Sequence, residues 1–153
     1  MVLEGPGGPF TLKARADRID VGEASVAIAD YKTGNVEPLV GKAKQGRAPQ
    51  LPLEAAIAIA GGFAGIQKRE VAGLRYISAS GGEPPGQDCA LPDAAERARQ
   101  ARDGLARLIA TFDDDSKPYR ALRRVRFDYR YDDYAHLARV AEWSAASLDE
   151  APA

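Results

Sequence analysis

The sequence has few of the residues on which several kinds of functional site depend. Its 153 residues include one cysteine, Cys89, and one histidine. A single cysteine excludes an internal disulfide framework and any Cys-rich zinc or iron–sulfur site built from this chain alone. No apolar run is long enough to span a membrane, and the N-terminus has neither the basic nor the apolar region of a secretory signal. We therefore expect a cytoplasmic protein with no membrane partner.

An excess of charge of one sign is also missing. Lysine and arginine number 21 against 22 aspartates and glutamates, which gives a net charge of −1. This balance gives no sign of a nucleic-acid partner, because phosphate contacts usually need a basic surface. The average hides a segregation, however: residues 42–47 and 117–130 are locally basic, while acids gather in residues 17–30 and 113–115. The charge balance alone therefore does not exclude DNA.

What is present fits one globular domain. Hydrophobic residues make up 45% of the chain and charged residues 28%, which is enough for a folded core. The periodicity predicts strands over 10–17, 26–32 and 71–79, with a turn at 20–25. It predicts helices over 49–60, 92–112 and 131–146, with loops over 35–49 and from 80 through Cys89. This order predicts an α/β or α+β domain, a short mixed β-sheet flanked by helices, with flexible ends at 1–9 and 147–153.

The first predicted hairpin brings two acids together. If its turn is centred on Glu23 and Ala24, facing residues have numbers that sum to 47, as Asp17 and Asp30 do. Directly opposed Cβ atoms lie only about 5 Å apart, where like charges repel, and a shared Mg²⁺ would explain the pair. Strand alternation places Lys32 on the same face as Asp30. Such a site can bind a metal and stabilise a developing negative charge.

The spacing alone leaves a second interpretation open. A solvated hairpin face with scattered charges explains the same residues. A slip of one residue in the strand register would also place Asp17 and Asp30 on opposite faces. A further argument is needed to choose between the two interpretations.

The local motifs favour the metal site. Residues 15–20 (RADRID) and 28–34 (IADYKTG) resemble the restriction-endonuclease-like core of PD-(D/E)XK nucleases of the RecB family, in which a G-x-x-D-R-x-D strand precedes a D-Y-K-[ST] strand. Residues 50–54 (QLPLE) resemble the Q-x-x-x-Y element on the helix that follows. Within the family, the likeness is to the C-terminal nuclease domain of AddB-type helicase–nuclease subunits, and it extends through residues 48–54, 61–63 and 133–143. It thus spans most of the chain.

The resemblance implies a role for each matching residue. Asp17 and Asp30 would hold Mg²⁺, for which Mn²⁺ can substitute. Tyr31 would offer its backbone carbonyl to the metal, while its ring packs in the opposite layer. Lys32 would orient the attacking water or stabilise the charge on the phosphorus centre. Gln50 would contact the nucleic-acid backbone or steady Lys32 from the helix.

A substrate, partners and a pathway are implied as well. The chain would be a metal-dependent DNA nuclease, an exonuclease rather than an endonuclease, that resects single strands or broken duplex ends in recombinational repair. We expect DNA contacts from Lys42, Lys44, Arg47 and Gln50. The expected partners are an AddA-type helicase–nuclease subunit and a helicase-like region N-terminal to this chain, which is short for a complete nuclease of the family and is interpreted as a fragment. The alternative is a non-catalytic DNA-binding or scaffolding module on the same fold, inactive as an isolated fragment.

Three departures from the family pattern stand out. Glu54 occupies the position of the family's aromatic residue; it could face the metal or pair with Arg15 or Arg47, and we favour a structural role. An upstream histidine or glutamate usually completes the metal shell, and only Glu4 is available for this. Some relatives hold an iron–sulfur cluster with four cysteines, and Cys89 alone does not support one.

Overall fold

The computed structural model describes residues 1–82 and 85–118. The chain divides into two units, Met1–Asp115 and Ser116–Ala153, and the description below concerns the first. The helix expected over 131–146, most of the basic segment 117–130 and the end at 147–153 lie outside the described residues. None of the helices in the described part of the chain combines the length and the apolar character needed to cross a membrane.

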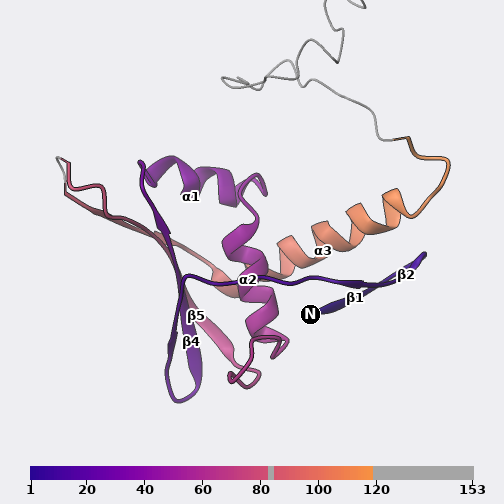
Figure 1. Ribbon diagram of the computed structural model, residues 1–153, viewed down its shortest axis with the longest axis horizontal. Helices are drawn as coiled ribbons and strands as arrows, with labels where there is room; N and C mark the ends of the chain where they lie inside the picture. Colours follow the sequence, from indigo (N-terminus) through magenta and orange to yellow (C-terminus); the bar gives the residue numbers. More distant parts are fainter. Residues whose placement is uncertain (83–84, 119–153) are drawn as a thin grey trace, which may run out of the picture. The chain divides into compact units, whose positions relative to one another are not determined.

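The first unit contains a four-stranded mixed sheet (Figure 1). Its strands, in spatial order, are β3 (Arg18–Val21), β4 (Ser25–Lys32), β5 (Glu70–Ser78) and β6 (Gln87–Leu91). Strand β4 pairs antiparallel with β3 and parallel with β5, and β6 pairs antiparallel with β5. A parallel pair needs a crossover connection, and two helices between β4 and β5 supply it. The mixed α/β architecture predicted from the sequence is confirmed.

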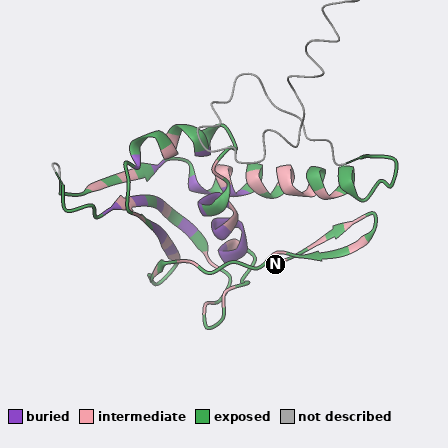
Figure 2. Cartoon of the chain, turned by 45° about the horizontal axis from the view of Figure 1, so that its top comes forward, coloured by how far each residue is buried: buried purple, intermediate pink, exposed green. Residues whose placement is uncertain are grey.

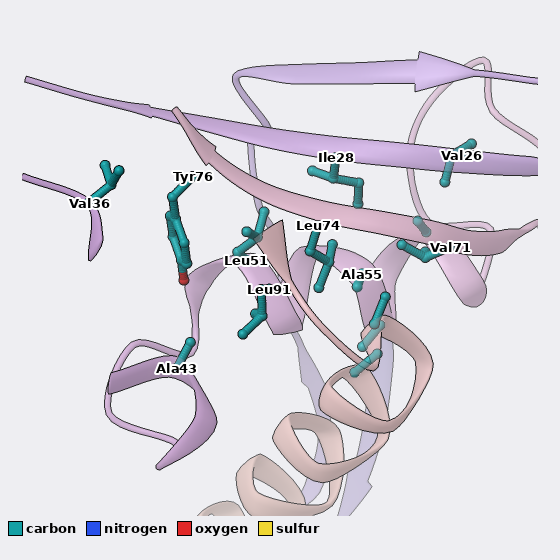
Figure 3. Close-up of a cluster of buried hydrophobic side chains, with 14 residues drawn as sticks. Val26, Ile28, Val36, Ala43, Leu51, Ala55, Val71, Leu74, Tyr76 and Leu91 are labelled. Atoms are coloured by element: carbon teal, nitrogen blue, oxygen red, sulfur yellow. The ribbon is translucent and has the colours of Figure 1, made fainter. Parts of the chain in front are cut away.

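Three helices accompany the sheet: α1 (Glu37–Lys44), α2 (Gln50–Ile59) and α3 (Ala94–Phe112). Helix α2 packs against β4, β5 and α3, while α1 packs against β6. The core lies between the sheet and these helices (Figure 3). Its fully buried members come from both layers: Val26, Ile28, Val36, Leu51, Ala55 and Leu74.

Helix α2 has the boundaries that its sequence predicts. Seven of its ten residues are buried, in agreement with a run that is apolar almost all round. Its C-terminus is fixed by Gly61, which takes a φ of +73°. The amide of Gly61 donates to the carbonyl of Ala58, and that of Gly62 to the carbonyl of Ile57. This is the Schellman arrangement, in which a residue in the left-handed region, usually glycine, follows the helix.

Helix α1 corrects the prediction of a loop over 35–49. Its sequence, EPLVGKAK, buries only Ala43, so it lacks the apolar stripe from which helices are recognised. Its ends nevertheless suit a helix, since Glu37 lies in the first turn and Lys42 and Lys44 in the last, where they oppose the helix dipole. The side chain of Gln87 ties the start of α1 to β6 by accepting from the amide of Val36 (3.3 Å).

The N-terminal segment also differs from the prediction. Instead of a flexible leader and a strand over 10–17, β1 (Val2–Gly5) and β2 (Gly8–Thr11) form a separate antiparallel hairpin. The turn uses Pro6 and Gly7, a dipeptide typical of turns. Residues 12–17 then form no strand. Alternation of apolar and polar residues does not by itself make a strand, because a strand also needs a partner. The edge of β4 is paired with Arg18–Val21. The predicted turn over 20–25 is too long, because Asp20 and Val21 belong to β3.

Two further differences concern Cys89 and α3. Cys89 lies in β6, paired with Tyr76, and not in a loop as expected, because the segment completes the edge of the sheet. The predicted helix over 92–112 is confirmed by α3, but burial is confined to Ala94 and Ala98 near its start. Farther along, Leu108 and Phe112 are exposed. Figure 2 shows the later turns of this helix in green and pink, the colours of exposed and intermediate residues.

Leu51 provides a test of this core. The residue is fully buried between α2 and the sheet, so Leu51→Ala should lower the free energy of unfolding by about 2–5 kcal/mol. Urea denaturation followed by circular dichroism measures the change, and Leu108→Ala on the exposed face of α3 is the matched control. A loss below about 1 kcal/mol for Leu51→Ala would contradict this packing.

Candidate active site

Strand β4 carries the first two residues of the site. Val26 and Ile28 point into the core, and alternation directs Asp30 and Lys32 to the same side. Asp30 is 1% exposed, and Lys32, which ends the strand, is more accessible. The strand therefore delivers a buried carboxylate and a half-buried ammonium to one end of the sheet.

Helix α2 begins beside these two side chains. Gln50 is its first residue and Glu54 lies one turn later on the same face. The amide nitrogen of Gln50, Nε2, donates to Asp30 Oδ1 (3.0 Å) and to Glu54 Oε1 (3.2 Å). Its amide oxygen accepts from Lys32 Nζ (3.3 Å). One glutamine thus connects the strand to the helix.

Lys32 and Asp30 form a close ion pair. The ammonium lies 2.8 Å from Asp30 Oδ1 and 2.7 Å from Oδ2. The contact with Oδ2 is electrostatic, because among the described residues this buried oxygen accepts no well-directed hydrogen bond. A buried carboxylate oxygen with free acceptor capacity is suited to a cation.

Asp17 reaches the same end of the sheet from the residue before β3. The pairs Arg18↔Ala29 and Ile19↔Ile28 confirm the predicted register, in which facing numbers sum to 47. The irregularity between Val26 and Ala27 affects the pairing with β5 and leaves this register intact. Asp17 Oδ2 accepts from the backbone amide of Tyr31 (2.9 Å). The Asp17 carboxylate is thereby held at the backbone between Asp30 and Lys32.

The Tyr31 ring differs from the expectation of a packed side chain. It alternates to the other face of β4 and is 45% exposed. Its hydroxyl accepts from Arg18 Nη1 (3.3 Å), and Arg18 is also ion-paired with Asp20. The hydrogen bond to Tyr31, followed by the contacts with Asp20, raises the pKa of the Arg18 guanidinium.

Glu54 and Tyr76 form a buried polar layer beneath the site. Both side chains are 2% exposed, and neither Glu54 Oε2 nor the Tyr76 hydroxyl has a hydrogen-bond partner among the described residues. Figure 3 shows Tyr76 reaching from β5 across the core. Burial raises the pKa of Glu54 and, with the nearby charges of Asp30 and Glu54, raises that of Tyr76 to about 12.

Glu4 and Cys89 are not brought to this cluster. Glu4 pairs with Pro9 in the β1–β2 hairpin, which contacts α3. Within residues 1–82 and 85–118, no three histidine, cysteine, aspartate or glutamate side chains are grouped so that they could hold a metal ion. The Tyr31 carbonyl, the other candidate ligand on β4, directly follows Asp30 in the chain.

Three of the predicted DNA-contacting residues precede Gln50 in the chain. Lys42 and Lys44 are exposed on the last turn of α1, and Arg47 is exposed in the connection to α2. Arg97 of α3 adds a guanidinium here, donating from Nη1 to the carbonyl of Lys44 (3.4 Å). The structure thus extends the basic segment with a residue distant in sequence.

Sequence reasoning gave too little weight to two residues of the site. Glu54 accepts a hydrogen bond from Gln50, a contact that was not among the expected alternatives of facing the metal or pairing with Arg15 or Arg47. The structural role that we favoured stays a prediction. The four-residue spacing from Gln50 was the available signal. Tyr76 had no such signal, because a tyrosine in an apolar strand is indistinguishable from an ordinary core residue.

The fold and the site together define a nuclease core: a mixed sheet flanked by helices, with an Asp-x-Lys strand end facing a helix that begins with glutamine. The chain belongs to the PD-(D/E)XK nuclease superfamily, whose family model matches residues 2–141. Nucleases of this superfamily generally use divalent metal ions such as Mg²⁺. No curated protein and no solved structure matches the chain.

Proposed function

We propose that the chain is a Mg²⁺-dependent deoxyribonuclease that hydrolyses phosphodiester bonds at the end of β4, as an exonuclease. The observation that carries the proposal is the joint placement of Asp17, Asp30, Lys32 and Gln50, from two strands and one helix, at a single site. Membership of a nuclease superfamily over residues 2–141 supports it.

The residues present fit a divalent cation. Asp30 Oδ2 is buried and retains acceptor capacity, and aspartate and carbonyl oxygens are ligands that Mg²⁺ prefers. Asp17, Asp30 and the Tyr31 carbonyl would hold the ion. When bound, it would neutralise phosphate charge and acidify a water molecule.

The chain's own side chains do the remaining work. Lys32 places a positive charge beside the carboxylates, where it stabilises negative charge that develops on the phosphate during attack. Gln50 restrains Lys32 through its amide oxygen. The N-terminus of α2, which has no side-chain cap, directs the positive end of its dipole toward the same region. These groups are arranged before substrate arrives.

The basic residues near Gln50 supply a test of the DNA path. Replacing Lys42, Lys44 and Arg47 together with alanine should weaken single-stranded DNA binding about tenfold and reduce the slope of log K against log salt by about 2. Fluorescence anisotropy in EDTA at several salt concentrations measures both. Arg75→Ala, which removes an exposed arginine paired with Asp88, is the control. An unchanged salt slope in the triple variant would exclude this path.

The biological role that we propose is that of an AddB-type nuclease domain. The D-R-x-D and D-Y-K-T motifs, with Gln50 at the start of the next helix, support it. The domain would act in the cytoplasm on single strands or broken duplex ends, in recombinational repair, with an AddA-type helicase–nuclease subunit and an N-terminal helicase-like region as partners.

A nuclease assay tests the function directly. Labelled linear and circular single-stranded DNA are incubated with the chain in Mg²⁺ and in EDTA, alongside a variant in which Asp30 is alanine. We expect Mg²⁺-dependent shortening of the linear strand, an intact circle and no cleavage by the variant. Cleavage that survives EDTA or the loss of Asp30 would exclude the proposed mechanism, and linearised circles would show an endonuclease.

One observation favours a second candidate, a non-catalytic DNA-binding module. The described residues contain no group of three metal-ligating side chains. Calorimetric titration with Mn²⁺ separates the two functions. If Mn²⁺ binds neither this chain nor a version extended at its N-terminus, the module is non-catalytic, whereas binding only to the extended version shows an incomplete site.

A further inference from the structure

Glu54 is an ionisable residue of the site to which neither the sequence motif nor the proposed mechanism assigns a role. It stands where the resembled motif has an aromatic residue, and it is 2% exposed. Its side chain lies one helical turn from Gln50 and accepts from Gln50 Nε2 at 3.2 Å. A carboxyl group buried this deeply is costly unless it is engaged.

The geometry around Gln50 depends on which end of its amide faces which neighbour. The nitrogen has two protons and lies between two carboxyl groups, those of Asp30 (3.0 Å) and Glu54 (3.2 Å). The oxygen, an acceptor only, faces Lys32 Nζ (3.3 Å). Rotating the amide by 180° would set its oxygen against two acceptors and its protons against an ammonium, so all three contacts would be lost.

Asp30 is a poor sole anchor for this orientation. Its Oδ1 accepts from Lys32 as well as from Gln50, and in the proposed function the same carboxylate holds the cation. Glu54 has no such competing task. Its Oε1 remains an acceptor whether the carboxyl group is charged or protonated, so its contact with Gln50 does not depend on its charge.

We propose that Glu54 is a positioning residue that fixes the amide of Gln50 with its oxygen toward Lys32, and so holds the Lys32 ammonium in place for the phosphate. The proposal rests on the proposed function for its effect on catalysis. Its structural content, the orientation of Gln50 by Glu54, can be tested without metal or substrate.

The kinetic test uses Glu54→Leu, Glu54→Gln, Gln50→Ala and the double variant Gln50→Ala/Glu54→Leu. Glu54→Leu should lower kcat about 10- to 100-fold, because a misplaced catalytic group costs this much. The Mg²⁺ midpoint and the KM for DNA should change less than about twofold, since Asp17 and Asp30 are untouched. Glu54→Gln keeps an acceptor oxygen and should lose about threefold. In the Gln50→Ala background, Glu54→Leu should cause no further loss.

A second readout uses the metal-free chain. Nitrogen-15 NMR of the side-chain amides should show the Gln50 protons protected from exchange in the wild type and exposed in Glu54→Leu. The side-chain amide of Gln100, which donates to Glu96 on the surface of α3, is the internal control and should not change. Thermal unfolding of each variant verifies that the fold is intact.

Each outcome decides for or against the proposal. A Mg²⁺ midpoint raised more than about tenfold in Glu54→Leu would make Glu54 a metal ligand and overturn it. Effects of Gln50→Ala and Glu54→Leu that simply multiply would also overturn it. If the wild type lacks Mg²⁺-dependent cleavage, the proposed function fails. The NMR result then decides by itself whether Glu54 orients the Gln50 amide. If the wild type cleaves but Glu54→Leu changes neither kcat nor the Gln50 amide, only this inference fails.

Discussion

Replacing Asp30 with asparagine should abolish both Mg²⁺-dependent cleavage and Mg²⁺ binding. Asparagine has nearly the same shape, and its one amide oxygen, in the place of Oδ1, can still accept from Lys32 and Gln50. It loses the second acceptor oxygen beside Lys32 and the buried charge that would hold the cation. The expected fall in cleavage rate is on the order of 10³-fold or more, because a cation held by Asp30 would supply both charge neutralisation and the activated water. Cleavage of a labelled single strand and calorimetric Mg²⁺ titration measure the two losses.

The fold should survive this substitution. Lys32 loses its ion-pair partner, but its side chain is 35% exposed and remains partly hydrated. Removing a buried charge also relieves a desolvation cost, so the free energy of unfolding should change by less than about 2 kcal/mol. Asp88→Asn on β6, an exposed acid paired with Arg75, is the matched control and should cleave normally. Mg²⁺ binding that persists in Asp30→Asn would place the cation elsewhere.

Replacing Lys32 with methionine should separate cleavage from metal binding. Lys32 Nζ lies 2.8 Å and 2.7 Å from the two oxygens of Asp30, so it neutralises the carboxylate that the cation would use. Removing it should therefore leave Mg²⁺ affinity unchanged or raise it a few-fold. Cleavage should nevertheless fall about 10²- to 10³-fold, since a charge aimed at the reacting phosphate is lost.

Lys32→Arg provides the control for charge. A guanidinium keeps the positive charge but cannot reproduce the compact ammonium geometry between Asp30 and Gln50, so the variant should recover little activity. The same calorimetric and cleavage assays apply to all three proteins. A large loss of Mg²⁺ binding in Lys32→Met would contradict the idea that the Lys32 ammonium competes with Mg²⁺ for the Asp30 carboxylate. Unchanged cleavage in that variant would remove Lys32 from the mechanism.

The parts of the site that follow from local pattern were predictable. Alternation along β4 places Asp30 and Lys32 on one side, and the turn after Val21 fixes the register of β3 against β4. The apolar run ending in two glycines predicts α2. These are short-range properties of the chain, and the motif resemblance added the expectation that Gln50 belongs with them.

The elements that were missed lack a strong local signal. Helix α1 buries one residue, and its stability depends on packing against β6 rather than on an apolar stripe. The β1–β2 hairpin uses a segment that is rich in glycine and proline, which was interpreted as a flexible leader. Helix α1 packs against β6, and β1 contacts α3. Both partners are too distant in sequence to influence the local periodicity.

By itself, the sequence determined the mixed α/β class, the strands β4 and β5 with the Asp-x-Lys end of β4, and the apolar helix α2, because backbone alternation and helical periodicity depend only on neighbours along the chain. The edge strands β3 and β6 became visible only in the tertiary structure. The tertiary structure decided which side chains meet. Gln50 contacts Asp30 across twenty residues, and Glu54 faces Gln50 rather than an arginine, because the crossover through α1 sets the start of α2 against the end of β4. It likewise left Tyr31 exposed, since burial depends on which elements cover a face and not on the order of residues within it.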